Sequence, residues 1–327
     1  MRTRRYLLSK VVQAVGTLLF ILVFNFLLFR VLPGDPARTL GRDRRLPKEA
    51  IVELQRDFGL NRPLTDQFVL YFEDTLTGNL GTSFAFRRPV SELIAERVPA
   101  TVLLVGFSTI ASTIIGLLIG IYGGWKRGSR FDLGSLGFSL VMYSMPEFWL
   151  GILLLIVFAA GVGFMPGIFP TGGIQTPNAD LSGFAGAIDV LNHLILPGLT
   201  LTLAYLGEYA LIMRSSLLDV MGEDYVTTAR AKGLREALVL RKHVVPNALL
   251  PTVTLTALNL GFVVSGAITV ETVFSWPGLG LLSISAVDAS DYPLLQGLFL
   301  LFSAAIVIAN LASDVVYSVL DPRVKEA

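Results

Sequence analysis

Two carboxylates inside long apolar stretches are the residues of this sequence best suited to chemistry. Glu147 and Glu208 each interrupt a run of hydrophobic residues, and a charged side chain at the centre of a bilayer costs on the order of 2.5–3.5 kcal/mol on insertion scales. Such a residue normally faces an aqueous cavity or a partner. Two interpretations stay open: the carboxylates line a path and attract a cationic group of a passing solute, or they are protonated or hydrogen-bonded to neighbouring helices.

The rest of the composition disfavours catalytic and metal-binding chemistry. The chain has no cysteine, and its two histidines, His193 and His243, fall in different predicted loops, so we expect no metal site. No Gly-Lys dipeptide occurs, which rules out a Walker A phosphate loop. We therefore expect no catalytic residue and no cofactor on this chain. A membrane enzyme is disfavoured because the apolar stretches offer only isolated carboxylates.

The elements that hold the two carboxylates are predicted to be membrane helices. Of 327 residues, 53% are apolar and only 16% are charged, which is typical of a protein embedded in a lipid bilayer. The net charge of +1 provides no basic face for nucleic acid. The sequence predicts an all-α membrane protein with six transmembrane helices. Their approximate bounds are Val11–Phe29, Ala100–Tyr122, Leu133–Ala160, Leu194–Met213, Ala248–Val270 and Leu294–Leu320.

Three local features refine this prediction. Small residues recur every fourth position in the second span, where they would let another helix approach closely; they are Ser108, Ser112, Gly116, Gly120 and Gly124. In the third span Pro146 has no backbone donor and predicts a kink. The stretch Leu279–Val287 is too short to span a bilayer, so it is predicted to be re-entrant or interfacial. Trp276 is predicted to be an interfacial anchor, with a gate as the alternative.

The distribution of basic residues predicts the orientation. The N-terminus, the second loop, the fourth loop and the C-terminus carry 4, 3, 6 and 2 Lys or Arg, whereas the third and fifth loops carry none. Short loops rich in Lys and Arg stay in the cytoplasm. Both termini and the fourth loop, residues 214–247, are therefore predicted to be cytoplasmic, in a multi-pass protein of a bacterial inner membrane.

The long first loop is predicted to form a small external helical segment. Pro47 can begin one helix that Gly59 ends, and a second helix carries an aromatic stripe, which includes Phe68 and Tyr71, before it ends at Gly78. We divide the chain into residues 1–99, the first span with this segment, and residues 100–327, a five-helix core.

The longest charged interruption between apolar spans is Gly222–Asn247, GEDYVTTARAKGLREALVLRKHVVPN, called here the charged segment. Glu223 and Asp224 favour a helix N-terminus, Gly233 can adopt the left-handed conformation that ends a helix, and Pro246 is predicted to stop a second helix. The segment is thus predicted to be a compact helical knob.

The charged segment resembles the "EAA" loop of bacterial ABC-importer permeases, in which a glycine is followed thirteen positions later by proline. Gly233 and Pro246 keep that spacing, and Tyr225 begins the similar wording YVTTARAKG; at the E-A-A places stand Thr227, Thr228 and Ala229. The departure is that threonines replace Glu and Ala. LPGDP, FGLNRPL, GNLGTS, ETVFSWPGLG, SDYPLLQG and LDPRV also resemble dipeptide and oligopeptide permeases, in their order along the chain.

This resemblance implies the type I importer permease fold and a set of partners. They are a second homologous permease subunit, two ABC ATPase subunits or domains that carry the ATP and Mg, and an external substrate-binding protein. The charged segment would dock on the ATPase, and this chain would form half of the peptide pathway. Related permeases move nickel, glutathione or oligosaccharides, which are alternatives. A self-contained secondary transporter or channel is a further alternative, but no inverted repeat that would favour it is found.

Overall fold

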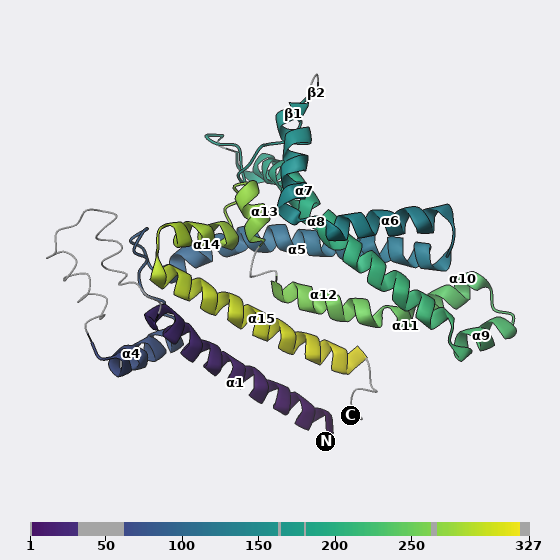
Figure 1. Cartoon of the computed structure of the whole chain (residues 1–327), viewed down its shortest axis with the longest axis horizontal. Helices are drawn as coiled ribbons and strands as arrows, with labels where there is room; N and C mark the ends of the chain where they lie inside the picture. The colour runs from purple at the N-terminus through teal and green to yellow at the C-terminus, as the bar shows by residue number, and fades with distance from the viewer. Residues whose placement is uncertain (1, 32–61, 163–164, 180, 263–266, 321–327) are drawn as a thin grey trace.

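The computed structural model describes residues 2–31, 62–162, 165–179, 181–262 and 267–320, and these are almost entirely helical (Figure 1). The predicted all-α class holds apart from one short antiparallel hairpin. The elements are α1 (Arg2–Val31), α4 (Leu64–Leu76), α5 (Val90–Trp125), α6 (Arg130–Ser144), α7 (Glu147–Leu154), the π-helical η1 (Leu155–Ala160), β1 (Gly161–Val162), β2 (Met165–Pro166), α8 (Gly183–Met221), α9 (Asp224–Ala231), α10 (Glu236–Val239), the π-helical η2 (Leu240–Val244), α11 (Val245–Ala248), α12 (Leu250–Phe262), α13 (Ile268–Val273), α14 (Leu279–Asp288) and α15 (Tyr292–Leu320).

Four helices, α1, α5, α8 and α15, are each long and apolar enough to cross a membrane, and the bent pair of α6 with α7–η1 makes a fifth candidate. The predicted fifth span is divided between α12 and α13, and residues 263–266 between them lie outside the described part of the chain. Length and composition therefore support four or five spans in the described residues, and the sixth stays a prediction.

The third predicted span is broken into two helices at Pro146 rather than kinked. The α6 helix and the α7–η1 helix meet at 104°. Met145 has extended backbone angles (φ −85°, ψ 128°) and Pro146 precedes the first residue of α7. A residue before proline is pushed out of the helical region by the proline ring, which is why α6 ends here and α7 leaves in a new direction (Figure 1).

The small-residue stripe of α5 lies against α8, as the sequence predicts for a close helix neighbour. A Cβ added at Gly116 would lie 2.6 Å from the Cβ of Tyr209, and one at Gly120 would lie 2.7 Å from the carbonyl oxygen of Ala210. Both distances are shorter than atoms can approach. Glycine is therefore required at these positions for the two backbones to touch.

Both long helices extend beyond the spans predicted from hydropathy. The α5 helix begins at Val90 rather than Ala100, because Leu93 and Ile94 bury their side chains against α14 and α15. The α8 helix begins at Gly183, so His193 lies buried inside a helix and not in a loop, which corrects the prediction. Hydropathy marks the part of a helix that lies in lipid, and a helix continues wherever protein contacts support it.

The segment predicted to be external is described from residue 62 onward, and the helix predicted between Pro47 and Gly59 lies outside the described residues. The second predicted helix is present as α4, and Phe68 and Tyr71 pack on Phe26 of α1. The end of the segment is held by the fully buried Asp291, whose carboxylate accepts hydrogen bonds from Ser83 Oγ and from the backbone N–H groups of residues 84 and 85.

The α13–α14 pair is fastened to α5 by a second buried carboxylate. Glu271 accepts hydrogen bonds from Thr101 Oγ1 (2.8 Å) and from the N–H of Leu281 (3.1 Å) in the first turn of α14. Trp276 is fully buried, and its indole N–H donates to the carbonyl oxygen of Ala100 at 2.8 Å. The prediction of an interfacial anchor is therefore wrong for Trp276: its polar atom finds a partner in the core, so it does not need a water-lipid boundary.

Candidate functional site

The charged segment is a compact set of short helices at the end of α8 (Figure 1). Glu223 and Asp224 begin α9, as predicted. Gly233 has φ +77° and separates α9 from α10, also as predicted. The prediction for Pro246 is wrong, because this residue lies near the start of α11 and the helical path continues from η2 through it. Proline is tolerated in a first turn, where no intrahelical donor is needed.

One face of α9 is exposed and the other is buried. Tyr225, Thr227 and Thr228 are exposed, as is Gly233 after the helix. Ala229, the third residue at the E-A-A places, is by contrast only 4% exposed. Its methyl group belongs to a hydrophobic cluster that joins α9 to α8, so its small size serves packing within this chain. The cluster consists of Met213, Leu217, Val226, Ala229, Val239, Val244 and Ala248.

Arg230 links the charged segment to α5 and joins two of its helices. Its guanidinium lies 5.8 Å from the ring centroid of Trp125, the last residue of α5, and its Nε is 3.1 Å from the Glu236 carboxylate of α10. The first contact is a cation–π interaction and the second closes the gap between α9 and α10. The charged segment is therefore connected to α5 as well as to α8.

One uninterrupted helix, α8, connects Glu208 to the start of the charged segment. The α8 helix runs from Gly183 to Met221 and ends at Gly222, where the charged segment begins. At 1.5 Å per residue, Glu208 lies about 20 Å from Met221 along this helix. A displacement of the charged segment along the axis of α8 therefore reaches Glu208 without passing through a loop.

The structure brings the two predicted carboxylates together around a residue that the sequence analysis missed. Tyr205 of α8 lies close enough to both Glu147 and Glu208 to interact electrostatically with them. Glu147 begins α7, and its Oε2 lies 3.5 Å from the hydroxyl of Thr269 on α13. Three helices thus meet at this cluster. Chemically it offers acceptors and negative charge, which suits the attraction of an ammonium group.

The two carboxylates differ in their partners. Glu147 accepts a hydrogen bond from Thr269 of α13 at 3.5 Å, so the interpretation of a helix-to-helix hydrogen bond has support for this residue. For Glu208, within the described part of the chain, no hydrogen bond is found, although its side chain is half-buried. The alternative of an unoccupied acceptor that faces a path therefore remains strongest for Glu208.

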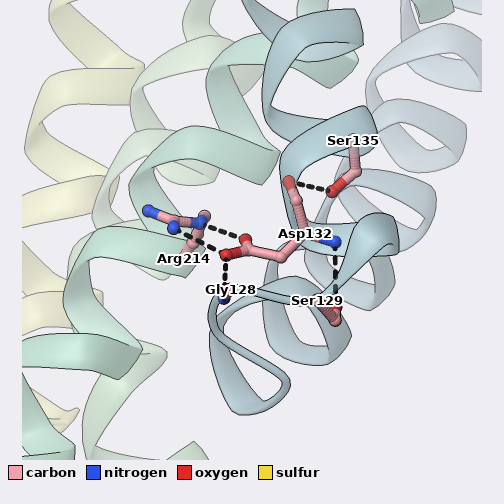
Figure 2. Close-up of polar contacts among 5 residues, drawn as sticks. All are labelled: Gly128, Ser129, Asp132, Ser135 and Arg214. Atoms are coloured by element: carbon pink, nitrogen blue, oxygen red, sulfur yellow. Dashed lines mark hydrogen bonds and ion pairs between the residues drawn. The ribbon is translucent and has the colours of Figure 1, made fainter.

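An ion pair that the sequence analysis also missed joins α6 to α8 (Figure 2). Arg214 donates to Asp132 from Nε (2.6 Å) and from Nη2 (2.9 Å), and the N–H of Gly128 donates to the same carboxylate at 2.9 Å. Asp132 is 1% exposed and Arg214 is 21% exposed. A forked arginine–carboxylate contact of this kind fixes both distance and orientation.

Sequence patterns could have signalled some of these residues. Asp132 and Arg214 are charges of opposite sign at the ends of two predicted spans, which suggests a pair, although it gives no partner among several candidates. Tyr205 and Thr269 gave no signal, because a tyrosine and a threonine inside apolar helices are common. Only the fold shows that they surround Glu147.

Comparison with known proteins covers nearly the whole chain. Residues 112–326 match the family described as binding-protein-dependent transport system inner membrane component, and residues 3–105 match the N-terminal region of such membrane components. The two matches meet within α5.

Similar proteins with assigned roles agree with these matches. The chain is 36% identical to the dipeptide transport system permease protein of Alkalihalophilus pseudofirmus, over 98% of this chain and 99% of that protein. It is 34% identical to the oligopeptide transport system permease protein of Bacillus subtilis, over 98% and 99%. It is 38% identical to the glutathione transport system permease protein of Pectobacterium atrosepticum, over 98% of each chain.

Proposed function

The chain belongs to the family of binding-protein-dependent transport system inner membrane components, and from this premise we propose that it forms half of the membrane pathway of an ATP-driven peptide importer. The relatives named for dipeptides, oligopeptides and glutathione share an amide-linked cargo. A peptide is therefore the cargo class that the relatives have in common. Nickel and oligosaccharides have no support of this kind.

We propose that the charged segment docks on an ATPase subunit. Tyr225, Thr227, Thr228 and Gly233 are exposed on one side of it, while its opposite side is buried against α8. A segment that transmits movement from a partner needs an exposed face to contact that partner and a buried face that fixes it to the rest of the chain. The ATPase subunits would bind the ATP and Mg, and this chain would add no cofactor and no catalytic step.

The cluster of Glu147, Tyr205 and Glu208 is proposed to attract the cationic amino terminus of the peptide. Glu208 is the residue with free acceptor capacity among the described contacts, and Glu147 is positioned by its hydrogen bond from Thr269. A charge at this depth acts in a low dielectric, where it attracts a cation more strongly than it would in water. Pro246, at the start of α11, keeps the base of the charged segment close to α12.

We further propose six spans, with the divided α12–α13 region as the fifth, and both termini in the cytoplasm. The domains are then residues 1–99, the first span with an external helical segment, and residues 100–327, the five-helix core that carries the loop 214–247. We propose a second homologous permease as a further partner, together with an external substrate-binding protein, which the family's description implies.

The observation that carries this proposal is the family match together with the exposed, supported face of α9. The test is reconstitution in liposomes of the tagged chain with its co-expressed permease and ATPase subunits and the binding protein. We expect uptake of tritiated di-, tri- and tetra-alanine that requires ATP and the binding protein. Uptake by this chain alone, without an ATPase, would establish a self-contained transporter or channel instead.

A further inference from the structure

We propose that the ion pair between Asp132 and Arg214 is a transmission joint: it forces α6 to follow α8, so that movement of the charged segment reaches Glu147 and Tyr205 together. The inference rests on the proposed function and names two positioning residues within it. Among the described residues, the polar contacts of Asp132 and Arg214 are with each other and with the turn that precedes α6, not with the carboxylate cluster. Their role would be to keep Glu147 on α7 aligned with Tyr205 and Glu208 on α8.

Few residues of α6 are buried against the rest of the chain. Along this helix, all of which is described, only Asp132 and Ser139 are buried. Its other side carries large exposed apolar residues, among them Leu133, Leu140 and Tyr143. Of these, Tyr143 lies beside Gly207 of α8, and the ring of Phe131 packs edge-on against Tyr122 of α5, with 4.8 Å between the ring centroids. The contacts of α6 with α8 are therefore centred on the two buried positions.

Those two positions form two separate anchors on α8. At Ser139 the backbones touch, because a Cβ at Gly207 would lie 2.4 Å from the Ser139 carbonyl oxygen. At Asp132 the contact is the forked ion pair with Arg214. Seven residues separate the anchors on each helix (139 − 132 and 214 − 207), which is about 10 Å. A helix fixed at two points cannot pivot, whereas a helix fixed at one can.

The ion pair also orders the turn that leads into α6. Asp132 accepts a hydrogen bond from the N–H of Gly128, and its own N–H donates to Ser129 Oγ at 3.1 Å (Figure 2). Ser129 is the N-cap of α6, so one carboxylate fixes the turn, the first turn of α6 and α8 at once. The α5–α6 hairpin thus has two connections. The ion pair joins it to α8, and the contact of Trp125 with Arg230 joins it to the charged segment.

The two routes from the charged segment meet again at the carboxylate cluster. The α8 helix carries Tyr205 and Glu208 directly. The α6 helix ends at Ser144, and Glu147 begins α7 three residues later. If α6 pivoted on α8, Glu147 would not follow the movement of Tyr205, and the two side chains would lose their proximity. The joint therefore couples the position of Glu147 to the state of the ATPase.

A double-variant cycle separates transmission from stability. Removing one partner of a buried ion pair leaves the other charge unpaired and destabilises a protein, whereas neutral replacement of both partners is often tolerated. We compare Asp132→Asn, Arg214→Met and the double variant in the reconstituted complex, with tritiated di-, tri- and tetra-alanine as probes. The readouts are complex recovery, melting temperature and peptide transported per ATP hydrolysed. Arg214→Lys keeps the charge but loses the forked geometry.

The double variant is expected to regain recovery and melting temperature but to transport about tenfold less peptide per ATP, within the range of allosteric coupling between sites. Arg214→Lys should fall between it and the wild type. The matched control is Asp314→Asn, which removes the ion pair of Lys10 with Asp314 (3.1 Å) and should keep the wild-type ratio. A stable double variant with the wild-type ratio would overturn the proposal.

Spin labels provide an arm that does not depend on how the variants fold. Since the chain has no native cysteine, cysteines at the exposed Leu133 and Ser215 report the distance between α6 and α8. A second pair, Ser215 with the exposed Phe299 of α15, reports movement of α8. With and without ATP, we expect the first distance to stay constant and the second to change. A change in the Leu133–Ser215 distance would refute the proposal that the ion pair holds α6 to α8. An unchanged Ser215–Phe299 distance, or no ATP-dependent uptake by the wild type, would instead refute the proposed function.

Discussion

Substitution of Gly233 provides the sharpest test of how the charged segment couples to an ATPase. In this chain nothing lies within 4 Å of a Cβ placed at Gly233, so a side chain meets no steric obstacle within the subunit. The cost comes from the backbone instead, because φ is +77°. A left-handed conformation costs a residue with a Cβ roughly 1–2 kcal/mol. At 1.4 kcal/mol per factor of ten, the population with the native turn falls about 5- to 30-fold relative to alternatives.

Three variants separate the effect of the turn from the effect of the contact surface. Gly233→Asn retains access to the left-handed region, which asparagine tolerates better than other residues with a Cβ, whereas Gly233→Ala and Gly233→Val do not. If the turn alone matters, Asn should behave like the wild type, Ala should lose coupling and Val should lose more. If the ATPase surface approaches closely at this point, Asn should fail as well.

The assay is purification of the tagged permease from membranes, with ATPase co-recovery and peptide-stimulated hydrolysis measured on the same sample. Membrane insertion should be equal for all variants, because the substitution lies outside the apolar spans. We expect Gly233→Val to reduce either co-recovery or stimulated hydrolysis strongly. Wild-type values of both for Gly233→Val would mean that this segment is not the coupling element.

Three further predictions test the topology, the pathway and the packing of the charged segment. Reporters fused after Lys126 or Arg235 should be cytoplasmic and one near Asn178 external, and the opposite labelling would contradict the six-span arrangement. Glu147→Gln should reduce uptake of alanine peptides more than that of the same peptides with an acetylated, neutral amino terminus at equal complex recovery; equal reductions, or loss of the complex, would favour a purely structural hydrogen bond. Ala229→Leu should overpack the cluster beneath α9 and destabilise it by about 1–3 kcal/mol, measured as a lower melting temperature of the complex, whereas an unchanged melting temperature would contradict the buried position of this methyl group.

Hydropathy predicted the helices that lie in lipid but not their ends. The α8 helix extends beyond its predicted span at both ends, and its first turns contain Asp189, whose carboxylate accepts hydrogen bonds from the N–H and the hydroxyl of Thr176. Such polar residues lower the mean hydropathy, so a hydropathy window along the sequence does not detect this part of the helix. Hydrogen bonds across the fold keep these turns helical. The early start of α5 has a different cause, the burial of Leu93 and Ile94 against α14 and α15.

Local backbone rules succeeded where the conformation depends on one residue. Gly233 adopts the left-handed conformation, and Pro146 breaks the third span. They failed where the surroundings decide: Pro146 produces a 104° bend that no single proline specifies, and Pro246 stays within a helical path because its missing donor falls in a first turn. A proline indicates where a helix can change, and the packing determines by how much.

The sequence by itself determined the class of this protein, because apolar run length, loop charge and the spacing of Gly233 and Pro246 are properties of consecutive residues. Only the tertiary structure decided which side chains meet. Tyr205 joins Glu147 to Glu208, Asp132 finds Arg214 at a separation of 82 residues, and Ala229 turns inward. These contacts depend on how closely α5, α6 and α8 approach one another. That approach is set by backbone contacts at glycines on facing helices, and a linear pattern does not record which helices face each other.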